Sequence, residues 1–199
     1  NYLIAIRKAQ EFHSINGGRD LEWISLGPEN IGGRITDLAC NPQEPATVYI
    51  AAASGGIYKT TDTGLTWQQI FTDAPVISIG DIALDPNNSM VIYAGTGEAN
   101  ASSYSFLGDG LWKSTDGGES WIHSGLESSA YIARIIVDYN NSDRVFAAAC
   151  GTLFSSSSER GVYRSADGGE SWDRVLFLTD STAAIDLVQH PTNPDILYT

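Results

Sequence analysis

Arginine and polar side chains beside apolar runs are the residues of this sequence with the clearest potential for ligand chemistry. Arg34 and Arg134 stand at similar points, each next to the start of an apolar run. A guanidinium group binds a carboxylate through two parallel hydrogen bonds, so both arginines are candidates for holding a carboxylate-bearing ligand. The remaining candidates, each of which could instead be a solvated loop residue, are Glu98, Asn100, Tyr104 and Arg160, and beside them Glu29, Asn30 and Glu159.

Three aspartates recur with the same neighbours, 54 and 51 residues apart. The segments 60–67, 114–121 and 165–172 all fit the pattern Ser/Thr-x-Asp-x-Gly-x-Ser/Thr-Trp. The aspartate and the preceding hydroxyl can accept hydrogen bonds from backbone N–H groups of their own turn, and the tryptophan offers a large apolar surface. We therefore expect structural and not catalytic roles for these pairs: Asp62 with Trp67, Asp116 with Trp121, and Asp167 with Trp172.

Each of these turns belongs to a longer repeat of about 50 residues with four short apolar segments. In the second repeat an apolar run, 79–84, is followed by an Asp-Pro-Asn-Asn turn and a β-branched run, 91–94. A third run ends in an aromatic residue before the Asp-Gly turn, and a fourth begins at the tryptophan. Asp-Gly is a strong hairpin signal because glycine accepts a positive φ.

Four strands per repeat predict an all-β fold, a β-propeller of four-stranded antiparallel blades. The sequence holds about three and a half blades, so the propeller is incomplete. We expect blades over 23–72, 73–124 and 125–177 and the start of another over 178–199, after an N-terminal helical or linker segment over 1–22. In such a fold the loops that carry the ligand candidates share one face around the central funnel. The expected partners are the remaining blades of the same polypeptide.

The pattern shared by 60–67, 114–121 and 165–172 resembles the Asp-box, or BNR, repeat of sialidases, sortilin-type receptors and xyloglucan-cleaving hydrolases. The resemblance covers residues 23–199. The amino-acid sequences of segments 27–34 and 95–100 are most similar to those of large exported bacterial proteins of the sortilin-like type. The resemblance therefore implies a secreted or cell-surface protein, with structural Asp boxes at the periphery of the propeller.

The hydrolases of this group imply catalytic residues that the sequence lacks. The Arg-Ile-Pro signature of sialidases is absent, because Arg34 is followed by Ile35 and Thr36. Xyloglucan-cleaving relatives carry a catalytic aspartate after the second strand of an early blade, where this sequence has Ala53. Cleavage of a glycoside needs a pair of carboxyl groups. No catalytic residue is assigned.

Three functions stay open at this point. The first is a binding module of an exported protein, with a protein or glycan as ligand. The second is a polysaccharide hydrolase of the sialidase or xyloglucanase type. The third is an assembly factor, because the photosystem II stability factor has a similar propeller.

The charge and composition of the sequence limit the ligands, cofactors and cross-links that we expect. The net charge of −13 over 199 residues repels phosphate backbones, so we expect no nucleic acid ligand. No apolar run approaches the roughly 20 residues of a membrane-spanning helix. The three histidines have no metal-ligand spacing and no phosphate-binding glycine loop occurs, so no metal or cofactor is expected. A disulfide between Cys40 and Cys150 is disfavoured, since they fall at different places in the repeat.

Overall fold

The computed structural model describes residues 33–199 except 73 and 104, and its regular elements are all β-strands. The first sheet is β1 (Ile35–Cys40), β2 (Val48–Ala52), β3 (Gly56–Thr60) and β4 (Gln68–Gln69). The second is β5 (Ile79–Asp85), β6 (Asn88–Thr96), β7 (Leu111–Ser114) and β8 (Ile122–His123). The third is β9 (Ile132–Val137), β10 (Val145–Ala149), β11 (Gly161–Ser165) and β12 (Asp173–Leu176). A two-stranded sheet follows, β13 (Val188–Gln189) with β14 (Leu197–Tyr198).

Each four-stranded sheet is an antiparallel meander whose strands follow chain order. A polar side chain at the end of each blade's first strand stabilises the turn that leads into the second strand. The side chain of Asn41 accepts a hydrogen bond from the N–H of residue 43 at 2.9 Å. The side chains of Asp85 and Asp138 accept the equivalent bonds from the N–H groups of residues 87 and 140, at 2.8 and 2.7 Å. Such Asx turns explain why an asparagine or aspartate stands between the first and second apolar runs of these three repeats.

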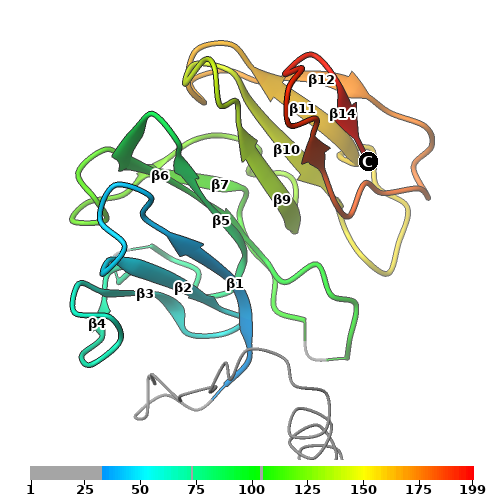
Figure 1. The fold of residues 1–199 in the computed structure, drawn as a ribbon. Helices are drawn as coiled ribbons and strands as arrows, with labels where there is room; N and C mark the ends of the chain where they lie inside the picture. The colour runs from blue at the N-terminus through cyan, green and yellow to red at the C-terminus, as the bar shows by residue number, and fades with distance from the viewer. Residues whose placement is uncertain (1–32, 73, 104) are drawn as a thin grey trace, which may run out of the picture.

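The sheets are arranged as consecutive propeller blades (Figure 1). The first strands, β1, β5 and β9, lie next to one another along the inner side, and β4, β8 and β12 form outer edges. The pair β13–β14 starts a fourth blade beside the third. The predicted incomplete β-propeller is confirmed. The predicted N-terminal helix and the 1–22 segment lie outside the described residues. Within these, no helix is long and apolar enough to cross a membrane.

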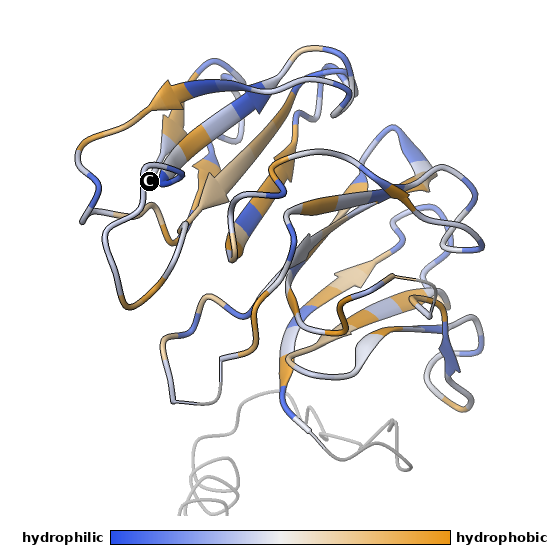
Figure 2. Cartoon of the chain, turned by 180° about the vertical axis from the view of Figure 1, so that it is seen from behind, coloured by the Kyte–Doolittle hydropathy of each residue, from blue (hydrophilic) through white to orange (hydrophobic). Residues whose placement is uncertain are grey.

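The hydrophobic core lies between successive blades and not within a single sheet. One cluster joins the first two blades through residues such as Tyr49, Ile57 and Ile92, and another joins the second and third through Leu111 and Ile132. In Figure 2 the apolar colour accordingly concentrates on the strands while the connecting loops are mostly polar. Stability of one blade therefore depends on its neighbours.

The repeated aspartate turns carry the same hydrogen bonds in all three blades. In the second, the Asp116 carboxylate accepts from the N–H of Ser120 at 2.9 Å and from its hydroxyl at 2.5 Å. The Ser114 hydroxyl accepts from the N–H of Gly118 at 2.9 Å and donates to Asp116 at 2.7 Å. These bonds lower the pKa of Asp116 to about 2, with the Ser120 hydroxyl as the largest contributor. The carboxylate is thus fixed in its ionised, accepting form.

Candidate functional site

A β-bulge interrupts each inner strand at the same place. The pairing between first and second strands skips one residue at Thr36 in β1, at Gly80 in β5 and at Ala133 in β9. A bulge bends the strand and redirects the side chain beside it. At Gly80 only glycine fits, because a Cβ there would lie 2.3 Å from the carbonyl oxygen of Ile132. All three bulge residues line one cavity.

The residue after each bulge is charged, and these residues meet between the blades. The guanidinium of Arg134 lies 3.0 Å from Asp81 and 4.0 Å from Asp37, both through Nη1, and its Nε lies 2.8 Å from Asp186. Asp186 precedes β13 and occupies the matching position of the fourth repeat. We call these four residues the inner-strand charge cluster.

Two members of the inner-strand charge cluster also tie neighbouring strands together. Asp37 on β1 accepts a hydrogen bond from the N–H of Ile82 on β5 at 3.1 Å. Asp81 on β5 accepts one from the N–H of Ile135 on β9 at 2.7 Å. Each aspartate therefore bridges to the next inner strand, and Arg134 replaces the aspartate at this position in the third blade.

The environment separates the pKa values within the cluster. Burial, followed by the negative charge of Asp37, raises the pKa of Asp81 to about 8, although Arg134 and the Ile135 N–H act against this rise. The hydrogen bond from Arg134 instead lowers the pKa of the exposed Asp186. The cluster therefore pairs a buried carboxyl that keeps its proton readily with an exposed carboxylate that loses it readily.

The charge cluster borders a cavity of about 500 Å³ on the side of the long loops. Ala99, Asn100 and Ala101 contribute from the loop after β6, and Leu153 from the loop after β10. Ile185 and Asp186 close it from the fourth repeat. Loops and inner strands that are distant in sequence thus form one concave surface with polar and apolar parts, which is the usual form of a small-ligand site.

Only two of the ligand candidates chosen from sequence line this cavity in the described structure. Arg134 and Asn100 both line the cavity. Tyr104, Glu29 and Asn30 lie outside the described residues. Glu159 is a partly buried loop residue whose carboxylate accepts a hydrogen bond from Ser158 at 2.9 Å.

Arg34, Glu98 and Arg160 make contacts elsewhere. Arg34 pairs with Glu98, which is fully buried and whose second carboxylate oxygen makes no hydrogen bond in the described structure. Arg160 is buried and donates to the carbonyls of Thr152 and Ser155 at 2.6 and 2.8 Å, so it orders its own loop.

Sequence reasoning missed three members of the inner-strand charge cluster, Asp37, Asp81 and Asp186. The signal was present: with Arg134 they hold one aligned position at the start of the first strand in four repeats. This alignment alone gives no indication of chemistry, because a strand pattern does not show which side chain a bulge redirects.

The arrangement suits hydrogen bonding to a ligand better than capture of an anion. Arg134 is already paired with the side chains of three aspartates, so no net positive charge is left for a ligand carboxylate. Asp186 and Asn100 are exposed at the cavity and offer acceptors and a donor.

The described residues contain no group of three His, Cys, Asp or Glu side chains placed to hold a metal ion. Cys40 is exposed and Cys150 buried, both as free thiols.

Comparison with known proteins gives relatives among xyloglucanases. Xyloglucanase Xgh74A of Acetivibrio thermocellus is 29% identical over 175 residues, 71% of this chain and 20% of the relative. A xyloglucanase of Paenibacillus sp. is 27% identical over 172 residues, 69% of this chain and 16% of the relative. This chain therefore spans a fifth or less of the length of these relatives. No family model matches it.

Solved structures agree on the fold. An ancestral GH74 enzyme matches with a TM-score of 0.69 and 28% identity, covering 88% of this chain and 22% of that one. A GH74 enzyme of Niastella koreensis matches with a TM-score of 0.58 and 23% identity, covering 78% and 24%. The described chain is a partial β-propeller similar to those of glycoside hydrolases.

Proposed function

We propose that this chain forms blades of a β-propeller that binds a neutral polysaccharide, in an exported or cell-surface protein. The observation that carries the proposal is the charge-balanced cavity at the inner strands. Its one arginine is neutralised by carboxylates, so the groups left for a ligand are hydroxyl-binding ones. A sugar chain offers hydroxyls to Asp186 and Asn100 and apolar ring faces to Leu153 and Ile185.

The charge of the chain supports a neutral ligand over an acidic one. At −13 the chain repels polyanions at long range, and the exposed rim of the cavity adds the carboxylate of Asp186. The relatives named as xyloglucanases point in the same direction, since xyloglucan is a neutral polysaccharide. Export is part of this proposal and is tested by locating the protein in the producing cell.

Affinity electrophoresis tests the binding proposal. The chain is run in native gels containing xyloglucan, or polygalacturonate as the acidic polymer. We expect retardation by xyloglucan only, and its loss in Asp186→Ala and Asn100→Ala. Asp173→Ala is the matched control, because Asp173 is an exposed carboxylate on the outer strand β12. Equal retardation of all three variants, or retardation by polygalacturonate alone, would reject the cavity as the binding site.

A hydrolase is the second candidate, favoured by the carboxyl of Asp81 in the cavity. Glycosidases use a general acid whose pKa is raised, and the pKa of Asp81 is raised to about 8. Against this role, both oxygens of Asp81 already accept hydrogen bonds, from Arg134 and from the N–H of Ile135. Position 53, where the resemblance implies a catalytic aspartate, is a buried alanine.

A reducing-end assay on xyloglucan separates the two candidates. Binding without release of reducing ends supports the binding function, and turnover that Asp81→Asn abolishes supports the hydrolase. The assembly-factor alternative stays a prediction, and co-purification with a membrane complex would favour it.

A further inference from the structure

Buried charge with an unused hydrogen-bonding atom occurs in both long loops that wall the cavity. Among the described residues, two buried side-chain polar atoms have no hydrogen-bond partner, Oε1 of Glu98 and Nε of Arg160. Glu98 lies in the loop 97–110 after β6, and Arg160 ends the loop 150–160 after β10. Because an unpaired buried polar atom costs stability, folding alone does not explain why a charged side chain stands at these two places.

Glu98 fixes the foot of the first of these loops. Its carboxylate is fully buried and pairs with Arg34, which precedes β1 and is half exposed. Gly97 and Gly108 bring the two ends of the loop into contact, since a Cβ on Gly108 would lie 2.3 Å from the nitrogen of Gly97. A loop closed in this way is an Ω-loop, a compact surface loop that often has a functional role. Asn100 of the cavity follows Glu98 by two positions, so the ion pair constrains where its side chain can reach.

Arg160 fixes the tip of the second loop. Its Nη2 donates to the carbonyl oxygens of Thr152 and Ser155 at 2.6 and 2.8 Å. These two carbonyls flank Leu153, which lines the cavity, and Phe154, which is 75% exposed. The hydroxyls of Thr152 and Ser155 lie 2.8 Å apart and close the same turn. A planar guanidinium that binds both sides of the turn therefore sets the position of Leu153 in the cavity wall.

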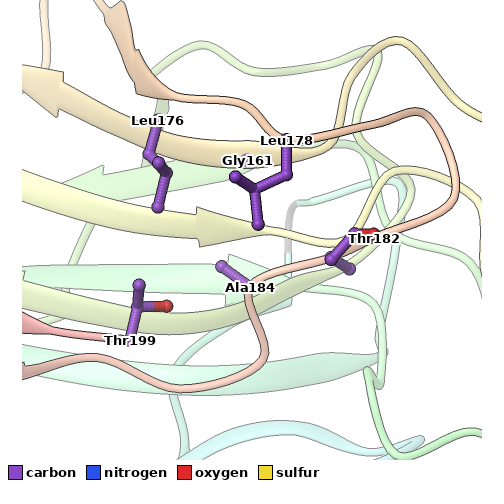
Figure 3. A pocket seen from close by; sticks show the side chains of 7 residues that line it. Gly161, Leu176, Leu178, Thr182, Ala184 and Thr199 are labelled. Carbon is purple, nitrogen blue, oxygen red and sulfur yellow. The ribbon is translucent and has the colours of Figure 1, made fainter.

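The opposite end of the third blade has a buried ion pair without this feature. Asp138 is fully buried and bonds Arg144, but its other oxygen accepts from the N–H of Asn140 at 2.7 Å. It lies in the turn between β9 and β10, at the other end of β10 from the loop 150–160. A second hollow, of about 200 Å³ beside Leu176 and Leu178, is lined by no charged side chain (Figure 3). Unpaired buried charge thus accompanies the cavity and is not a general property of turns or hollows in the described chain.

We propose that the Arg34–Glu98 pair and Arg160 are positioning residues, which hold Asn100 and Leu153 in the binding geometry before a glycan arrives. This role rests on the glycan-binding function proposed above and adds three residues that do not line the cavity themselves. A wall that is already ordered loses less conformational entropy when the ligand binds, so the affinity rises. Charged groups supply this order because their hydrogen bonds have a fixed direction, whereas an apolar side chain packs without one.

Two variants that remove the buried charge test the proposal. They are the double change Arg34→Met with Glu98→Met, and the single change Arg160→Met, whose freed carbonyls lie in a partly exposed turn that water reaches. We expect the dissociation constant for soluble xyloglucan, measured by affinity electrophoresis of the whole chain, to rise about tenfold in each. The melting temperature of the double variant should stay unchanged or rise, because two apolar side chains replace a buried ion pair with an unpaired oxygen. A loss of affinity without a loss of stability is the result that a purely structural role would not give.

Two controls separate the position of a charge from its mere removal. The double change Arg144→Met with Asp138→Met removes the ion pair at the opposite end of the blade. It should lower the melting temperature, since it also leaves the N–H of residue 140 without its acceptor, and it should leave the xyloglucan affinity unchanged. Glu98→Gln keeps an oxygen that can accept from Arg34, so it should retain the wild-type affinity within about threefold.

Hydrogen exchange of the unliganded chain gives a readout that needs no glycan. We expect faster backbone exchange over 99–103 in the Arg34→Met, Glu98→Met variant and over 152–155 in Arg160→Met. If the wild type binds xyloglucan and these variants lose no more affinity than the control pair does, the positioning role is overturned while the binding function stands. If the wild type does not bind xyloglucan, the binding function fails. Unchanged exchange in the variants then overturns the positioning role as well, whereas faster exchange still assigns the order of the loops to these residues.

Discussion

Asp81 gives the sharpest test of how charge is arranged at the inner strands. Its side chain is 3% exposed, and burial with the neighbouring Asp37 raises its pKa to about 8. An aspartate in an unfolded chain ionises near pH 4. Between about pH 4 and pH 8 the folded protein therefore holds a proton that the unfolded chain has released. The contribution of Asp81 to the free energy of unfolding is full below about pH 4 and falls as the pH rises.

Asp81→Asn should remove this pH dependence. The amide has the shape of the protonated carboxyl, and its oxygen can still accept from the N–H of Ile135. One such group changes the free energy of unfolding by at most about 1.4 kcal/mol per pH unit. Over the interval the variant should therefore become more stable than the wild type by a few kcal/mol. We expect equal stability near pH 4 and a more stable variant at pH 8. Urea unfolding followed by tryptophan fluorescence, repeated from pH 4 to pH 9, measures the difference.

Asp186→Asn is the matched control, with the opposite sign. Asp186 is 59% exposed, and the hydrogen bond from Arg134 lowers its pKa. Its contribution is present at neutral pH and is lost as the pH falls through the lowered pKa, so the variant's curve should run parallel to the wild type between pH 5 and pH 8. If the Asp81→Asn curve also runs parallel there, Asp81 is ionised in the folded protein and the ion pair with Arg134 outweighs burial.

Three further changes test the aspartate turns by thermal and urea unfolding. Ser114→Ala should cost about 1–3 kcal/mol, because it leaves the buried N–H of Gly118 without its 2.9 Å acceptor. Tyr93→Phe should cost about 1 kcal/mol, since it removes the buried 2.8 Å bond to the carbonyl of Gly168 between two blades. Thr63→Gly should stabilise the chain by up to about 1 kcal/mol, because Thr63 has a φ of 60°, which a β-branched residue adopts only under strain.

Each of these changes has a counterpart elsewhere in the chain. Ser128→Ala, at an exposed serine, should leave stability unchanged. Tyr49→Phe should cost less than Tyr93→Phe, since its hydroxyl bond is longer, 3.4 Å. Gly117→Ala should destabilise, because Gly117 has a φ of 72° at the position matching Thr63. The reasoning is refuted if Ser114→Ala costs no more than Ser128→Ala, if Tyr93→Phe costs no more than Tyr49→Phe, or if Thr63→Gly destabilises the chain as Gly117→Ala does.

The strand order and the turns were predictable because each depends on residues close in sequence. The apolar run 79–84 predicted β5, observed as Ile79–Asp85, and the run 91–94 predicted the centre of β6, Asn88–Thr96. The hydrogen bonds of Asp116 join it to Ser114 and Ser120, a span that a local pattern encodes in full. The repetition of this pattern about every 50 residues then predicted four strands per blade and their antiparallel order.

The candidate site was not predictable in the same way because its members come from four repeats. Asp81 and Arg134 are 53 residues apart, and their contact depends on bulges at Gly80 and Ala133. A bulge changes which face of the strand a side chain takes, and the alternation of apolar and polar residues does not record it. Asn100 was predicted as a loop residue of the ligand-binding face and it lines the cavity, yet its neighbours there could come only from the coordinates.

Arg134 stands where the other three repeats have an aspartate, and this difference explains how the inner strands tolerate their charges. If position 134 were an aspartate like its counterparts, Asp37, Asp81 and Asp186 would face a fourth carboxylate with no cation between them, and like charges so close raise one another's pKa. Arg134 contacts all three, and it is 38% exposed, so its own charge stays partly solvated. The substitution therefore converts a row of repelling carboxylates into a neutral core with one exposed acceptor at its rim. On this reasoning Arg134→Asp, which restores the regular repeat, should destabilise the chain more than Arg134→Met, and more strongly at pH 8 than at pH 5.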